Sequence, residues 1–271
     1  MDTYARLKDG TKWMWSLGDY PSLAVRLQPY AEALAAAASI EPGMRVLDVA
    51  AGDGNLALAA ARRGAAVTAC DLTPRMVELG RARSEATGLS IEWREADAEE
   101  LPFPPAGFDV VASVFGAMFA PRPERVAAEL FRVARPGGLV AMANYDGGGL
   151  MGRVSELISS FGPPPSVDLP SPFSWGDPGE VRSRFRELAS SVEVNGRTGR
   201  FEFGSVEEGV EFWERTNPPL SALRALLSEE AHRDVVAALT RLFSRLNATN
   251  DGRLVLEWGY VEVLARKPGP A

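Results

Sequence analysis

The sequence predicts an α/β fold, with a doubly wound, mainly parallel sheet of seven strands and an α-helical cap insertion. Two observations support this prediction. From Arg45 onward, apolar runs of strand length alternate with helix-length segments, which is typical of a parallel sheet with helices on both faces. After Tyr145 the alternation stops, and a long helical tract separates two further runs rich in β-branched and aromatic residues.

Length and composition limit the classes of protein to consider. The 271 residues suffice for one large α/β domain with an insertion, and a net charge of -7 argues against nucleic acid as a partner. The single cysteine, Cys70, excludes an intramolecular disulfide framework and a cysteine-rich zinc site, and we expect no bound metal. Because no apolar run is long enough to span a bilayer, we expect a soluble, cytoplasmic monomer or homodimer.

The N-terminal segment, residues 1–40, is predicted to combine a flap with helices. Its first 20 residues carry tyrosines, tryptophans and glycines without a clear period, which favours a flap or short irregular helices. The next stretch consists mostly of good helix formers interrupted by Pro29. We therefore expect one helix that ends near Leu27 and another that begins near Pro29.

Five strands are predicted for the core, residues 41–145. They are the runs RVLDVA, AAVTACD, LSIEWREAD, FDVVASVF and GLVAMANY, with helices expected at Leu56–Arg63, Thr73–Thr87 and Pro123–Val133. The rest of the chain is predicted as a lid or insertion with a helix (146–190), two antiparallel strands that complete the sheet (191–203 and 253–267), and a helical cap insertion (204–252).

A glycine loop follows the first predicted strand and opens a helix. The segment Gly52–Ala57, GDGNLA, fits the pattern G-x-G-x-x-G/A. Glycines let the backbone approach a ligand closely, and the helix N-terminus favours negative charge. Taken alone, the pattern serves NAD and other nucleotides alike, or only a tight turn.

Three acidic residues lie at the ends of the first three predicted strands, namely Asp48, Asp71 and Asp97. Because the carboxyl ends of parallel strands meet at one crevice, we expect these side chains to surround one ligand. Asp71 falls where a carboxylate accepts hydrogen bonds from a ribose diol. Asp48 and Asp97 would repel the charges of a pyrophosphate, so a polar, partly cationic ligand fits better.

Four stretches together resemble the class I S-adenosylmethionine-dependent methyltransferases, and specifically the ubiquinone and menaquinone C-methyltransferase group. They are VLDVAAGDGN, CDLTPRMVELGRAR, EADAEELPFPPAGFDVV and LFRVARPGGLVAM, in the family's order and spacing. The resemblance covers residues 10–145 and implies a Rossmann-like fold. It also implies transfer of a methyl group from S-adenosylmethionine to a small organic acceptor, with S-adenosylhomocysteine as the product and the acceptor atom open between carbon, oxygen and nitrogen.

The resemblance implies a role for each matching residue. The methionine part of the cofactor would be lined by Asp48, Ala50 and Gly52, and Gly54 would permit the turn. Asp71 would accept hydrogen bonds from both ribose hydroxyls, Leu72 and Met76 would lie against the adenine, and Asp97 and the Ala98 backbone would bind the adenine nitrogens. The residues near the sulfonium would be Ser113, Val114 and Phe115. The flap with Trp15 and Tyr20 would close over the cofactor. The family often has threonine or serine where this chain has Asp53, and the sequence gives that residue no role.

Residues for the acceptor are predicted near the end of the fifth strand and beyond it. Tyr145 and Asp146 are candidates for an acid or base, and Asn144, Trp175 and Asn217 are candidates for substrate contacts. Asn217 also begins NPPL, which is typical of a helix stop. The one histidine, His232, lies among charged residues that predict a solvated helix start, and we do not expect it to be a catalyst.

Two alternatives to methyl transfer remain open. One is a protein with the methyltransferase fold that binds the cofactor without methyl transfer, in a cyclase or binding role. The other is an NAD-dependent oxidoreductase, which Asp48 and the lack of an identifiable Ser, Tyr and Lys proton relay disfavour.

Overall fold

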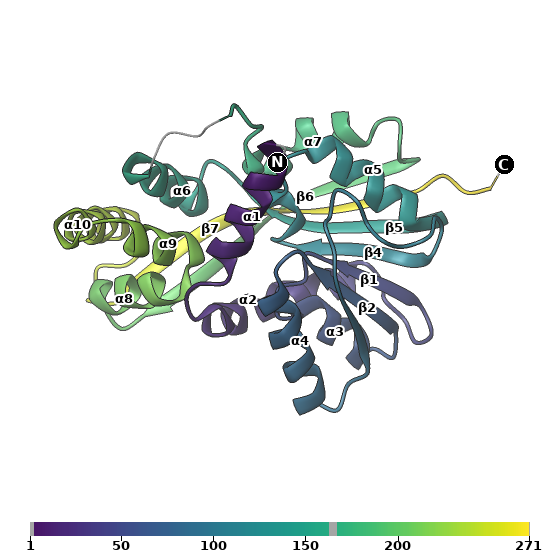
Figure 1. The fold of residues 1–271 in the computed structure, drawn as a ribbon, viewed down its shortest axis with the longest axis horizontal. Helices are drawn as coiled ribbons and strands as arrows, with labels where there is room; N and C mark the ends of the chain where they lie inside the picture. The colour runs from purple at the N-terminus through teal and green to yellow at the C-terminus, as the bar shows by residue number, and fades with distance from the viewer. Residues whose placement is uncertain (1–2, 163–166, 271) are drawn as a thin grey trace. The chain divides into compact units, whose positions relative to one another are not determined.

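The structure is a computed structural model that describes residues 3–162 and 167–270. The described residues form a seven-stranded sheet of order β3-β2-β1-β4-β5-β7-β6 (Figure 1), which confirms the predicted fold class. The strands are β1 (Arg45–Val49), β2 (Ala66–Asp71), β3 (Ile91–Glu95), β4 (Phe108–Val114), β5 (Ala134–Tyr145), β6 (Ser191–Phe203) and β7 (Leu254–Arg266).

Contacts group the chain into two compact units. The core unit comprises the described residues of Leu27–Asn144, Leu169–Gly196 and Val261–Ala271. The helical unit comprises those of Met1–Arg26, Tyr145–Asp168 and Arg197–Tyr260. The segment boundaries predicted from the sequence divide the chain differently and stay a prediction, and part of segment 146–190 lies outside the described residues.

The core unit contains the doubly wound part of the sheet. β1 pairs in parallel with both β2 and β4, so the chain leaves β1 on one side and returns on the other. Right-handed crossovers then place α3 (Asn55–Arg62) and α4 (Pro74–Ala86) on one face, and α5 (Pro123–Val133) on the other. The first turns of α4 and α5 contain a proline, where its missing N–H leaves no helical bond unmade.

The core unit also holds two later segments of the chain, Leu169–Gly196 and the described residues of Val261–Ala271. Two short 3-10 helices, η1 (Ala117–Phe119) and η2 (Pro172–Gly176), contact each other, and α7 (Pro178–Phe185) packs against α5 and η2. β7 runs antiparallel to β5, because Lys267 N donates to Gly138 O at 2.9 Å while Asp146 N donates to Gly259 O at 3.2 Å. The two segments predicted as late strands are both strands, β6 and β7.

The helical unit contains α1 (Thr3–Trp15), the first turns of α2 (Tyr20–Ala37), α6 (Leu150–Phe161), α8 (Val206–Thr216), α9 (Pro218–Leu226) and α10 (Glu229–Leu246). The tract between β6 and β7 is therefore three helices, each of which begins with a side-chain cap. Ser205 accepts from Glu208 N, Asn217 from Leu220 N and Ser228 from Ala231 N. The predicted helix stop at Asn217 is confirmed.

The N-terminal prediction was wrong in two respects. Residues Thr3–Trp15 form one regular helix instead of a flap or short irregular helices, and α2 is continuous although Pro29 lies inside it. Leu27 and Ala31 are buried on either side of Pro29, as is Leu34 further along. Burial of this apolar face outweighs the proline's cost of about 3 kcal/mol in a helix interior.

Close packing of α4 on β3 depends on a glycine. A Cβ at Gly80 would lie 2.1 Å from the ring of Trp93, whereas real contacts of this kind are essentially never under 3.0 Å. The indole Nε1 of Trp93 donates to Ser84 Oγ at 3.0 Å, one turn further along α4. The tryptophan is therefore fixed from two sides and has little room to move.

We predict that Gly80→Ala lowers the free energy of unfolding by about 1–3 kcal/mol, because the new methyl group overpacks the Trp93 ring. The loss should appear in urea unfolding even though alanine favours a helix by about 1 kcal/mol over glycine. The matched control is Gly10→Ala in α1, where an added Cβ meets nothing within 4 Å, and which we expect to be neutral or stabilising. Equal effects of the two substitutions would contradict the prediction.

Candidate functional site

The turns after β1 and β4 touch each other in the core unit. Ala50 and Phe115 each have a φ of 54°, in the left-handed region that costs a non-glycine residue free energy. A Cβ on Gly116 would lie 2.2 Å from the carbonyl oxygen of Ala50, so only glycine permits this approach. The crevice between these two strands is the point at which the strand order reverses, where open α/β sheets bind ligands.

Two buried carboxylates hold the glycine loop through backbone amides. Asp71 Oδ2 accepts from Gly52 N at 2.9 Å, and its Oδ1 accepts from Thr73 N at 2.9 Å. Asp48 Oδ2 accepts from Ala57 N at 2.9 Å, in the first turn of α3. The ends of β1 and β2 and the start of α3 are therefore joined by acids that sequence analysis assigned to the ligand.

Burial makes these carboxylates weak acids. Desolvation raises the pKa of Asp48 to about 8, the amide of Ala57 opposes the rise, and the charges of Asp71 and Asp53 add to it. Desolvation also raises the pKa of Asp71, against the amides of Thr73 and Gly52. A cationic group beside these acids would stabilise their charged forms, so the site favours a ligand that carries positive charge.

The structure gives Asp53 a role that the sequence did not. Its buried carboxylate lies 3.1 Å from Nη1 of Arg83 in α4, and the same guanidinium donates to Asn55 Oδ1 at 2.8 Å and to Gln28 Oε1 at 3.0 Å. Burial raises the pKa of Asp53 to about 6, with Arg83 acting against the rise. Arg83 thus braces the glycine loop from α4.

The loop after β3 is fixed in a similar way. Asp97 Oδ1 accepts from Glu99 N at 2.9 Å, and Ala96 N donates to Asp71 O at 2.9 Å, which places this loop beside the end of β2. Glu99 is buried and accepts from Arg122 Nε at 2.8 Å and from Arg122 N at 2.7 Å. The one signal for this pair in the sequence is the acidic stretch of Glu99 and Glu100 shortly after Asp97.

The cofactor residues predicted within the core unit lie at one edge of the sheet. Ser113 Oγ accepts from Ala117 N at 3.0 Å, and the Phe115 ring packs edge-on to Tyr30 at 6.3 Å. These residues lie at or just after the carboxyl ends of β1 to β4, or at the start of α4. They are Asp48, Ala50, Gly52, Gly54, Asp71, Leu72, Met76, Asp97, Ala98, Ser113, Val114 and Phe115.

Two predicted acceptor residues also belong to the core unit. Asn144, at the end of β5, is 1% exposed, and no described residue accepts a hydrogen bond from its Nδ2. An unpaired buried amide costs free energy, so this group is suited to a ligand oxygen. Trp175 is also 1% exposed, with Phe185 edge-on at 5.9 Å and Arg184 stacked at 4.4 Å, and its indole Nε1 has no acceptor among the described residues. The substrate contacts predicted for Asn144 and Trp175 stay predictions.

The other predicted site residues lie in the helical unit. Tyr20 packs edge-on to Trp15 at 5.8 Å, and Tyr145 packs edge-on to Trp258 at 5.4 Å. Asp146 Oδ1 accepts from Gly149 N at 3.0 Å, just before α6 begins. Asn217 caps α9, and His232 Nε2 lies 2.7 Å from Glu214 Oε1. The roles predicted for Tyr20, Tyr145, Asp146 and Asn217 in cofactor or acceptor binding stay predictions, as does the expectation that His232 is not a catalyst.

Comparison with known proteins assigns the chain to a family. A family described as "Methyltransferase domain" matches residues 47–142. An uncharacterised protein of Mycobacterium tuberculosis is 38% identical over 258 residues, or 94% of this chain and 93% of that protein. The ubiquinone/menaquinone biosynthesis C-methyltransferase of Bordetella parapertussis is 39% identical over 165 residues, 58% of this chain and 60% of that protein.

The chain belongs to the class I S-adenosylmethionine-dependent methyltransferase family. The resemblance described from the sequence and the cofactor that it implies are therefore confirmed.

Among solved structures, a putative methyltransferase of Bacillus halodurans has a TM-score of 0.63 at 21% identity, covering 88% of this chain and 98% of that chain. The [4+2]-cyclase SpnF has a TM-score of 0.56 at 19% identity, covering 90% and 81%. Both likenesses concern the fold.

Within residues 3–162 and 167–270, none of the helices is both long and apolar enough to cross a membrane.

We predict that the unliganded protein loses stability as the pH rises from 5 to 8, and that Asp48→Asn reduces this loss. The folded pKa of Asp48 is about 8 and its ordinary value is 3.8, so the folded state binds more protons between these values. The free energy of unfolding therefore falls as the pH rises through that window. At pH 8 the variant should exceed the natural protein by more than about 1.4 kcal/mol, the equivalent of one pKa unit.

The measurement is urea unfolding at a series of pH values without cofactor. The control is Asp109→Asn at the start of β4, where hydrogen bonds from Arg45 N and Arg135 outweigh desolvation and lower the pKa of the carboxyl. That variant should not reduce the loss between pH 5 and 8. A stability that is independent of pH in the natural protein would show that Asp48 does not carry the raised pKa.

Proposed function

We propose that this protein transfers a methyl group from S-adenosylmethionine to a small organic acceptor, at the crevice of its core unit. The observation that supports this best is the set of buried acids, Asp48, Asp53 and Asp71, around a left-handed glycine loop at the ends of β1 and β2. Their raised pKa values favour a ligand that is cationic beside them. S-Adenosylmethionine, when bound, supplies a methyl group attached to a positively charged sulfonium sulfur. After the methyl group is transferred, this sulfur is left as a neutral thioether.

The residues present fit this cofactor. Asp71 accepts from Gly52 N through Oδ2 and from Thr73 N through Oδ1, and the Thr73 side chain and the Leu72 backbone also donate to its carboxylate. A ribose diol would join or replace these donors at an acceptor that is already oriented. Asp48 suits the ammonium of the methionine part. Asp97 and the Ala98 backbone would hold the adenine nitrogens, Leu72 and Met76 its faces, and Ser113 and Phe115 would lie toward the sulfonium.

The protein's contribution to the reaction is position and exclusion of water. Methyl transfer is an in-line displacement, so its rate depends on how well donor and acceptor are aligned. The amide bonds to Asp71 and Asp48 and the Arg83 brace fix the loop before any ligand arrives. The unpaired Nδ2 of Asn144 is available to orient an oxygen of the ligand.

We predict that Asp71→Ala weakens S-adenosylmethionine binding by about 1–3 kcal/mol through loss of the ribose hydrogen bonds. Titration calorimetry measures the change. The control is Asp109→Asn at the start of β4, which removes the same single negative charge. Affinity unchanged in Asp71→Ala would exclude the ribose role. Tight binding of NAD with no response to S-adenosylmethionine would exclude the proposed function.

A second candidate is a protein that binds the cofactor without transferring its methyl group. The likeness of fold to the cyclase SpnF favours keeping this alternative, because a methyltransferase fold there carries a different reaction.

Turnover distinguishes the two candidates. We expect the protein, incubated with S-adenosylmethionine and a panel of phenols, amines, carboxylic acids and quinols, to release S-adenosylhomocysteine in step with one methylated product. The natural protein with each acceptor omitted is the control for spontaneous cofactor breakdown. Binding of the cofactor with no release above that control would favour the second candidate.

A further inference from the structure

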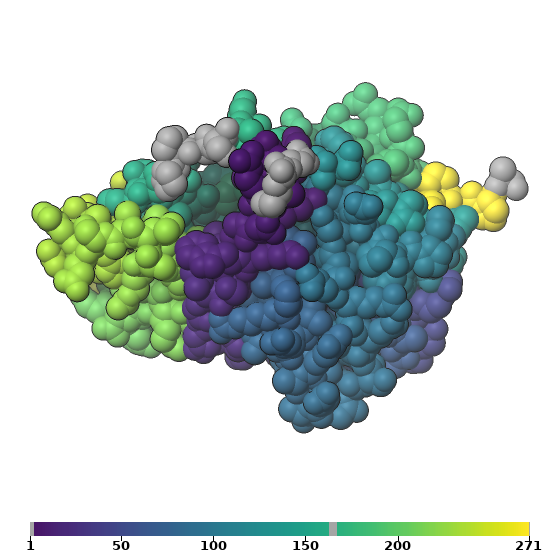
Figure 2. Space-filling view, viewed as in Figure 1, coloured from purple at the N-terminus to yellow at the C-terminus, as the bar shows by residue number. Residues whose placement is uncertain are grey.

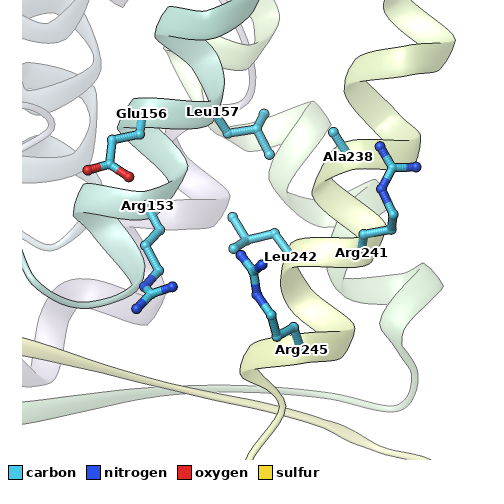
Figure 3. A pocket seen from close by; sticks show the side chains of 7 residues that line it. All are labelled: Arg153, Glu156, Leu157, Ala238, Arg241, Leu242 and Arg245. Atoms are coloured by element: carbon cyan, nitrogen blue, oxygen red, sulfur yellow. The ribbon is translucent and has the colours of Figure 1, made fainter.

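A pocket lies in the helical unit, between α6 and α10. Its volume is about 450 Å³, within the range of small-molecule sites. Figure 3 shows the side chains that line it, which are Arg153, Glu156, Leu157, Ala238, Arg241, Leu242 and Arg245. α6 and α10 pack against each other, so the pocket belongs to one helix pair.

The lining is strongly basic in a protein that is acidic as a whole. Three arginines and one glutamate give the lining a nominal charge of +2, against a net charge of -7 for the chain. Arg241 and Arg245 stand four residues apart on one face of α10, an arrangement of like charges that destabilises a helix. Arg245 also faces Arg153 of α6, so an anion near it would offset like charge from both helices.

The guanidinium groups of the pocket are not neutralised by any neighbouring acid that the structure describes. Arg83, Arg122 and Arg132 elsewhere in the chain each have a carboxylate partner within 3.1 Å. In the part of the chain that the structure describes, no ion pair joins Arg153, Arg241 or Arg245 to an acid, although Glu156 lines the same pocket. Their guanidinium donors are therefore available to a ligand.

The side chains place charge beside an apolar surface. Figure 3 shows Arg245 reaching from α10 into the space between the helices, opposite Arg153 of α6, while the carboxylate of Glu156 points away from both. Leu157 and Leu242 lie between the helices, and Ala238 lies one turn before Leu242. The surface around α9 and α10 is the yellow-green region of Figure 2. Arg153, Arg241 and Arg245 are all exposed, so a ligand can reach their guanidinium groups from solvent.

We propose that this pocket binds a small amphiphilic anion, with a phosphate or carboxylate head held by Arg153 and Arg245 and a short apolar tail on Leu157, Ala238 and Leu242. Guanidinium groups match planar carboxylate and phosphate oxygens with paired hydrogen bonds. Exposed charges alone bind weakly because salt screens them, so the apolar wall supplies the rest of the affinity. The proposal does not depend on methyl transfer.

The test is titration calorimetry of the full chain, free of cofactor, with octyl phosphate below its micelle concentration. Inorganic phosphate provides the head alone, and octyl glucoside provides the tail with an uncharged head. We expect octyl phosphate to bind more tightly than either. Equal affinity for octyl glucoside would show that the anion contributes nothing and would overturn the proposal.

Matched variants locate the site. Arg153→Gln and Arg245→Gln should each weaken octyl phosphate binding about tenfold, since each removes charge-assisted hydrogen bonds. Arg233→Gln removes the same charge from an exposed position of α10 outside the pocket, and should leave the affinity unchanged. An equal loss in Arg233→Gln would mean attraction to the general charge of α10 and would contradict a defined pocket.

A filling variant separates the pocket from its charges. Ala238→Phe keeps all three arginines but occupies the apolar wall, so it should abolish preference for octyl phosphate over inorganic phosphate. Circular dichroism and thermal unfolding would check that each variant is folded. Octyl phosphate bound by a folded Ala238→Phe as tightly as by the natural protein would show that the tail lies elsewhere.

Discussion

The carboxylate of Asp71 joins the ends of two strands through backbone amides from Gly52 and Thr73. The carbonyl of the same residue accepts from Ala96, which brings the loop after β3 to the same place. One residue therefore sets the distance between three loops that form the candidate site. Because Asp71 is also the residue expected to take the cofactor's ribose, the loops are arranged around the group that the ligand contacts.

This arrangement has an electrostatic cost. Asp48, Asp53 and Asp71 are buried near one another, and desolvation is the main reason that their pKa values rise. Arg83 offsets part of this cost at Asp53. At neutral pH the unliganded protein holds acids that would be more stable in water, which is a common cost of a preformed binding site.

Local sequence patterns were sufficient to predict the strands and the helix stop at Asn217. Apolar periodicity and proline determine backbone conformation over only a few neighbouring residues. These patterns failed at Pro29, where the outcome depends on the burial of Leu27 and Ala31. Local patterns also gave no partner for Asp53, since Arg83 reaches it only once α4 has packed beside α3. The pocket between α6 and α10 was missed for the same reason, because its residues come together only through tertiary packing.

The position of β7 has a consequence for the order in which the chain is made. β7 lies between β5 and β6 in the sheet, yet it follows both in the sequence. During synthesis β5 and β6 leave the ribosome before the strand that joins them exists, and each then presents unpaired backbone groups along an edge. The sheet therefore closes in one late step, and the nascent chain is most prone to aggregation while α8–α10 are being translated.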